Sequence, residues 1–74
     1  MTKKKIIVID DVELNRVILA EAFKNDYEVL QAENGAVGLK KIRENLNDLA
    51  AIFLDIIMPE MDGFAVLQEL KSAL

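Results

Sequence analysis

Residues 5–11 read KIIVIDD, a β-branched run that ends on two adjacent acids. A strand with one solvated face alternates apolar and polar residues, whereas a strand covered on both faces is apolar throughout, as is typical of parallel sheets. We therefore predict a buried strand over residues 5–9, ended by Asp10 and Asp11.

Helical spacing follows this strand. Apolar residues recur between Glu13 and Lys24 at positions that a helix brings together: Leu14, Val17, Ile18 and Ala22. Asp11 is predicted to cap this helix, because a carboxylate accepts hydrogen bonds from the first free backbone amides.

The strand–helix pattern then repeats twice. We predict a strand over residues 27–32, a turn over 33–35, a helix over 36–45 and a strand over 49–54. A last helix follows a loop that contains Pro59, with Asp62 as its cap. The inward positions predicted for the second helix are Val37, Leu39, Ile42 and Leu46. Those predicted for the last helix are Phe64, Val66, Leu67, Leu70 and Leu74. Three strand–helix units in succession predict one α/β domain over residues 1–74, built on a parallel sheet with right-handed crossovers.

The composition excludes several kinds of function. Among the 74 residues, 53% are hydrophobic and 30% are charged, as in a globular domain. There is no cysteine and no histidine, which excludes disulfides, thiolate metal sites and the commonest general base, and favours a cytoplasmic location. The net charge of −4 argues against nucleic-acid binding. No run approaches the ~20 apolar residues that cross a membrane.

Three acids end two of the predicted strands. Asp10 and Asp11 end the first strand, and Asp55 ends the third. Parallel strands end at one edge of the sheet, so these carboxylates are expected to meet at the crevice where open α/β sheets bind ligands. Clustered carboxylates repel one another unless a cation such as Mg²⁺ lies between them. A carboxylate beside Mg²⁺ can also attack a phosphoryl group and form an aspartyl phosphate.

The chain resembles the receiver domains of two-component response regulators. The resemblance rests on VIDD at 8–11 followed by Asn15-Arg16, on AENG at 32–35, and on LDIIMPEMDG at 54–63. It implies a flavodoxin-like fold in which Asp55 takes phosphate from a histidine kinase. It also implies a Mg²⁺ ion bound by Asp11, Asp55 and the backbone carbonyl of Ile57, with Asp10 acting through water. Val12 is one departure, because many relatives carry a polar residue there.

A complete receiver has five strand–helix units, whereas this chain contains three, so we expect a (βα)3 half of the fold. No residue matches the family's Ser/Thr after the fourth strand or its Lys after the fifth. Right-handed crossovers place the strands in the order 2-1-3, with helices on both faces and the third strand at an open edge. That edge, AIFL at 51–54, is uncharged. We therefore expect a homo-oligomer, in its simplest form a dimer, that forms through this edge or through an exchanged segment.

Two interpretations of the function follow from these residues. The first is a phosphoacceptor signalling module rather than an enzyme. The second is a self-associating half-domain, natural or engineered, that keeps only a structural or metal-binding remnant of the site.

Two other classes fit the sequence poorly. An Asp-nucleophile phosphohydrolase of the haloacid dehalogenase kind needs a second Asp two positions after its nucleophile, where this chain has Ile57 and Glu13. A nucleotide-binding loop fails because Gly35 and Gly38 lack the required spacing and follow the second strand.

Overall fold

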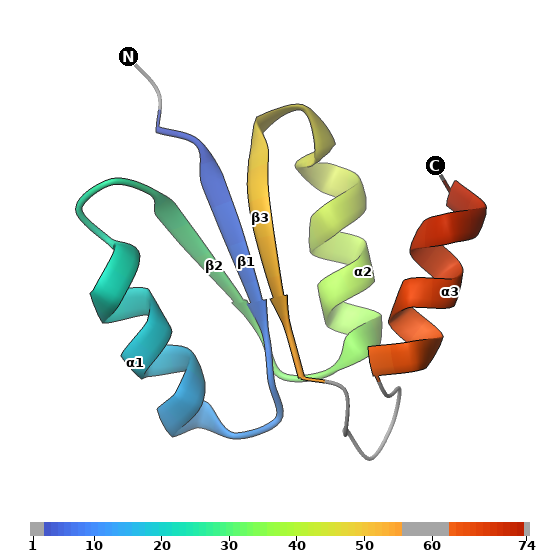
Figure 1. The fold of residues 1–74 in the computed structure, drawn as a ribbon, viewed down its shortest axis with the longest axis horizontal. Coiled ribbons are helices and arrows are strands. Elements are labelled where there is room, and N and C mark those ends of the chain that lie inside the picture. Colours follow the sequence, from blue (N-terminus) through green and yellow to red (C-terminus); the bar gives the residue numbers. More distant parts are fainter. Residues whose placement is uncertain (1–2, 56–62, 74) are drawn as a thin grey trace.

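The structure is a computed structural model that describes residues 3–55 and 63–73. Strands and helices alternate along these residues (Figure 1). In chain order they are β1 (Lys5–Ile9), α1 (Glu13–Phe23), β2 (Glu28–Ala32), α2 (Gly35–Glu44), a 3-10 turn (Leu46–Asp48), β3 (Leu49–Leu54) and α3 (Gly63–Ala73). The predicted elements are thus confirmed to within a residue or two at each observed boundary. The predicted cap Asp62 lies outside the described residues.

The sheet has the predicted order β2-β1-β3, and both pairings are parallel. Ile9 lies opposite Ala32 on one side and opposite Leu54 on the other. The register with β3 shifts once near its start, between the partners of Lys5 and Ile6. The flavodoxin-like (βα)3 arrangement is therefore confirmed.

The central strand holds the core. Its four isoleucine and valine residues are exposed by 2% or less, as a strand covered on both faces requires. Ile7 and Ile9 pack with Leu39 and Ile42 of α2 and with Val66 of α3. On the other side of the sheet lies α1, whose Phe23 stacks on Phe53 of β3 with ring centroids 5.3 Å apart (Figure 1). Within the described part of the chain, no helix is long and apolar enough to cross a membrane.

The first helix is confirmed, but the apolar stripe predicted for it does not face the core. Leu14, Val17 and Ile18 are exposed by 65%, 41% and 57%, and Ala22 is exposed as well. The half-buried face of α1 carries Arg16, Leu19, Ala20 and Phe23 instead. These four positions also have helical spacing. Because one of them is an arginine, a search for apolar residues alone does not find this stripe.

Three further details differ from the predictions. Leu67 of α3, predicted to face inward, is 49% exposed. Val12 is the N-cap of α1, so the predicted cap at Asp11 is wrong; the amide of Val12 bonds the carboxylate of Asp10 instead, at 2.9 Å. Leu46 is 49% exposed, because α2 ends at Glu44 and Leu46 begins the 3-10 turn. At the other end of α2, the side chain of Asn34 caps the helix by accepting the amide of Val37 at 2.9 Å.

Close packing explains the glycine inside α2. A Cβ atom at Gly38 would lie 2.4 Å from Cδ1 and 2.7 Å from Cγ1 of Ile9, a residue with no exposed surface. A glycine inside a helix costs up to ~1 kcal/mol relative to alanine. At this position the missing side chain lets α2 lie close to the end of β1, at the residue that precedes Asp10.

We expect Gly38→Ala to destabilise the domain despite its better helix propensity. Overpacking of a buried site costs about 1–3 kcal/mol, which exceeds the gain in propensity. Urea unfolding followed by circular dichroism measures the difference. The control is Lys40, which is exposed in the middle of the same helix: the difference between Lys40→Ala and Lys40→Gly reports the propensity difference alone. A Gly38→Ala protein more stable than the parent would contradict the packing argument.

Candidate functional site

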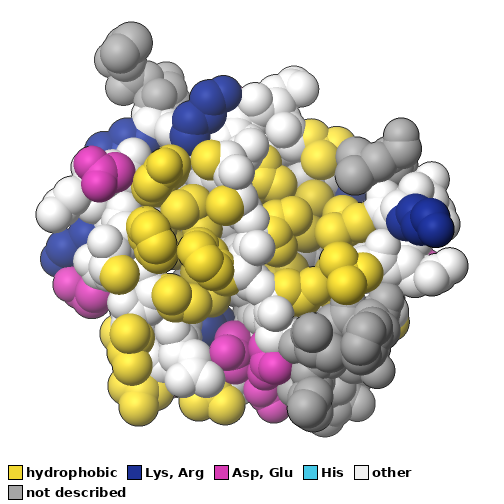
Figure 2. Space-filling view, viewed as in Figure 1, with side chains coloured by type: hydrophobic (Ala, Val, Ile, Leu, Met, Phe, Trp, Pro, Cys, Tyr) yellow, Lys and Arg dark blue, Asp and Glu magenta, His cyan; other side chains and the backbone are white. Residues whose placement is uncertain are grey.

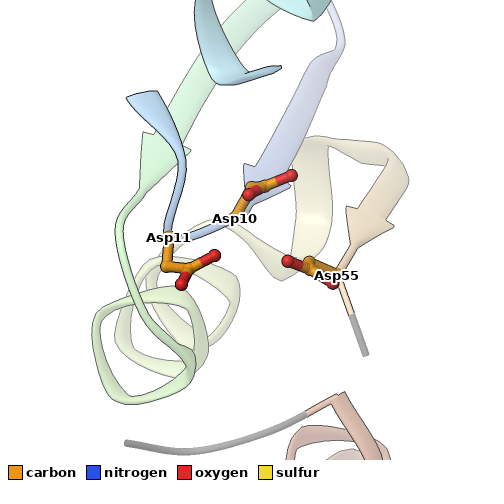
Figure 3. Close-up of side chains that lie close together, drawn as sticks. All are labelled: Asp10, Asp11 and Asp55. Atoms are coloured by element: carbon orange, nitrogen blue, oxygen red, sulfur yellow. The ribbon is translucent and has the colours of Figure 1, made fainter. Parts of the chain in front are cut away.

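The acids predicted from the sequence do converge. Asp10 and Asp11 follow β1 and Asp55 follows β3, and one carboxylate oxygen from each lies within 4.8 Å of the other two (Figure 3). Asp10 and Asp55 are half-buried, whereas Asp11 is exposed. The fourth predicted ligand, the carbonyl of Ile57, lies outside the described residues, as does the loop around Met58 and Pro59.

Hydrogen bonds hold Asp10 on several sides. Its amide donates to the carbonyl of Ala32 at 3.1 Å, which continues the β1–β2 ladder by one residue. Its carboxylate accepts the amide of Val12 at 2.9 Å and the side-chain amide of Asn15 at 3.2 Å. Both oxygens therefore have protein partners already, which suits an acid that acts on a metal through water rather than by direct ligation.

Asp55 is positioned by the other ladder. Its amide donates to the carbonyl of Ile9 at 2.9 Å, so the backbone at Asp55 is tied to the residue that precedes Asp10. The burial of β1 thus fixes both acids at once, and the distance between them follows from the spacing of adjacent strands.

Sequence reasoning did not assign a role to Arg16. Its Nη1 donates to the carbonyl of Asp10 at 2.7 Å, and its Nε donates to Oε1 of Gln31 on β2 at 3.3 Å. The first turn of α1 is thereby attached to the ends of β1 and β2. The sequence signal for this role was the dipeptide Asn15-Arg16 shortly after the acids, because both side chains donate hydrogen bonds to Asp10.

An open pocket of about 310 Å³ adjoins the acids. Its polar part consists of Asp10, Asn15 and Asp55, and its apolar part consists of Val8, Ile9, Leu19, Phe53 and Leu54. The space between the acids is therefore reachable from solvent, on the side of the sheet that carries α1. An oxygen-only donor set with solvent access fits a hard divalent cation that keeps several waters, as Mg²⁺ does.

Comparison with known proteins agrees with this geometry. Residues 6–73 match the model of the response regulator receiver domain. The chain belongs to this family. Receiver domains are two-component signalling modules, and the carboxylates brought together here are those that the sequence pattern singled out.

Individual relatives support the assignment. The chain is 41% identical over 70 residues to the chemotaxis protein CheY of Bacillus subtilis, covering 92% of this chain and 57% of that protein. A solved receiver domain protein from Clostridium thermocellum is 32% identical, with a TM-score of 0.85 over 95% of this chain and 56% of the other. CheY4 of Vibrio cholerae is 25% identical, with a TM-score of 0.86 over 97% of this chain and 59% of the other. The chain thus spans a little over half the length of these proteins.

Arg16→Ala is expected to lower the free energy of unfolding by about 1–3 kcal/mol, because it leaves the half-buried carbonyl of Asp10 without its charged donor. The control is Arg43→Ala, which removes an arginine that is 58% exposed and whose ion pair with Glu69 spans 3.6 Å. An exposed pair of this kind contributes at most ~1 kcal/mol. Urea unfolding of both variants compares them, and equal losses would show that the bond to Asp10 adds nothing.

Proposed function

We propose that this chain is the phosphoacceptor part of a two-component phosphorelay, with Asp55 as the residue phosphorylated. The observation that carries the proposal is the convergence of Asp10, Asp11 and Asp55 within 4.8 Å in a chain of the receiver family. Asp55 also borders the open pocket, so a phosphodonor can reach it. The donor is a histidine kinase, and the relay operates in the cytoplasm.

The chemistry assigned to Asp55 is nucleophilic. A carboxylate oxygen of Asp55 attacks the phosphorus of a phosphohistidine, the phosphorus–nitrogen bond breaks, and the histidine nitrogen keeps the electron pair and takes up a proton. The product is an aspartyl phosphate. No oxidant or reductant is consumed.

Mg²⁺ is the cofactor that this donor set suits. Asp11 and Asp55 would bind it directly together with the carbonyl of Ile57, and Asp10 would bind through water. Bound there, the ion neutralises charge on the carboxylates and on the incoming phosphoryl group. The two hydrogen bonds accepted by Asp10 support its indirect role, and the exposure of Asp11 supports its direct role.

Self-association belongs to the same proposal. We propose a homo-oligomer formed through the open edge of β3 or by exchange of a segment, because an uncharged edge strand is a template for pairing with another chain. The second interpretation of the function, a self-associating half-domain with only a metal-binding remnant, rests on the same edge and differs only in whether Asp55 can be phosphorylated.

Amide NMR separates these two interpretations. We expect Mg²⁺ to shift the signals of Asp10, Asp11 and Asp55, and beryllofluoride, which mimics the phosphoryl group, to shift Asp55 and its neighbours further. Asp55→Asn should abolish the beryllofluoride response. Asp48→Asn removes the same charge from the opposite end of β3, where the side chain is 54% exposed, and should leave both responses intact. Shifts with Mg²⁺ but none with beryllofluoride would favour the remnant.

Asp11→Asn is expected to weaken Mg²⁺ binding at least tenfold, since even indirect metal contacts are typically worth 10–100-fold in affinity. Titration calorimetry of the parent, Asp11→Asn and Asp48→Asn measures the three affinities. An Asp11→Asn protein that binds Mg²⁺ as tightly as Asp48→Asn would exclude Asp11 as a direct ligand.

A further inference from the structure

The carbonyl of Asp10 belongs to the peptide that joins the two adjacent acids. A peptide group is planar, so the direction of this carbonyl also sets the direction of the amide of Asp11. Nη1 of Arg16 donates to the carbonyl at 2.7 Å. Arg16 therefore holds the peptide plane on the amino-terminal side of Asp11.

The peptide on the other side of Asp11 is held as well. The amide of Val12 donates to Oδ1 of Asp10 at 2.9 Å. The backbone of Asp11 lies between these two held planes, which leaves its two soft dihedral angles little freedom. The direction in which the Asp11 side chain leaves the backbone is thus set by two hydrogen bonds.

The exposure of Asp11 makes this control of the backbone important. Figure 2 shows acidic side chains together at the surface, where β1 and β3 end in Figure 1. Asp10 and Asp55 are half-buried, whereas Asp11 is exposed. An exposed side chain gains little restraint from packing, so the direction of the Asp11 carboxylate depends mostly on its backbone.

The guanidinium of Arg16 is oriented by a second contact. Its Nε donates to Oε1 of Gln31 on β2 at 3.3 Å, and both side chains are half-buried. The donors of a guanidinium form a rigid planar fork, so a partner at Nε restricts the direction of Nη1 as well. Gln31 thereby helps to direct the donor that reaches Asp10.

Gln31 is itself anchored from the opposite face of the sheet. Its backbone carbonyl accepts a hydrogen bond from Nζ of Lys41 on α2, whereas its side chain bonds Arg16 on α1. The two helices cover opposite faces (Figure 1). A series of three hydrogen bonds thus runs from α2 through β2 and α1 to the peptide between the acids, and none of the three involves β3 or α3.

We propose that Arg16 and Gln31 are positioning residues for the cation site. They act by fixing the peptide between Asp10 and Asp11, and so the direction of the Asp11 carboxylate. Both hydrogen bonds of this pair to Arg16 end on uncharged oxygens, so the contribution is to direction rather than to neutralisation of charge. The inference rests on the Mg²⁺ role proposed for Asp11.

Charge alone predicts the opposite effect on the cation. A guanidinium beside a cation site repels the ion, so losing its charge would tighten binding. Two variants leave the charge unchanged and disturb only the geometry. Arg16→Lys can no longer reach Asp10 and Gln31 through one planar fork. Gln31→Met removes the acceptor for Nε but keeps Arg16, and it serves if Arg16→Lys does not fold.

NMR relaxation of the cation-free protein tests the inference without a ligand. The amide of Asp11 should have an order parameter of about 0.85 in the parent, as in rigid backbone, and below ~0.6 in Arg16→Lys and Gln31→Met. Gln31→Glu keeps an oxygen for Nε and should restore the parent value. The matched controls are Arg43→Lys and Gln68→Met, since both of these side chains belong to exposed residues of other helices.

Titration calorimetry with Mg²⁺ then measures the consequence for the site. Arg16→Lys and Gln31→Met should weaken binding about tenfold, at the lower end of the effect of residues that orient a metal ligand, and the controls should bind as the parent does. Order parameters that stay at the parent value in both variants would overturn the inference, and so would an unchanged affinity. A parent that does not bind Mg²⁺ would instead overturn the proposed cofactor, a result distinct from binding that the variants leave unaltered.

Discussion

The burial of β1 is the constraint on which the rest of the structure depends. This strand is hydrogen-bonded on both edges and covered on both faces, so its position allows almost no adjustment. Asp10 leaves the sheet at the end of β1, and Asp55 is bonded to Ile9 at the same level. The geometry of the acids is therefore set by the hydrophobic core. Gly38 belongs to the same constraint, because it lets α2 pack directly on Ile9.

The two adjacent acids Asp10 and Asp11 have different surroundings. Asp10 is half-buried, and its carboxylate and backbone have partners in α1, in the turn before it and in β2. Asp11 is exposed. Each oxygen of Asp10 already accepts one hydrogen bond, which leaves Asp10 fewer lone pairs for a metal than the exposed carboxylate of Asp11 has. This difference in surroundings supports the proposal that Asp11 binds the ion directly and Asp10 binds it through water.

Much of the fold follows from pattern alone. The unbroken apolar run at residues 5–9 predicted a strand covered on both faces, and the acids after residues 9 and 54 were placed at one edge by the topology of parallel strands. The face of α1 was not predictable in this way. Two stripes in that helix have helical spacing, and the more apolar one, through Leu14, Val17 and Ile18, is the exposed one. The inward stripe includes Arg16, whose charge is satisfied by the carbonyl of Asp10, a partner that only the folded chain provides.

The strand that supplies Asp55 also joins the site to the packing around α1. Phe53 and Leu54 line the pocket beside the acids, and the ring of Phe53 stacks on Phe23 of α1 with centroids 5.3 Å apart. The amide of Asp55 is bonded to the carbonyl of Ile9, so the end of β3 is held by the buried strand as well. Asp55 is therefore held from two directions, by the backbone of β1 and by the aromatic contact between β3 and α1. A change that loosens either contact reaches the carboxylate without altering any acid.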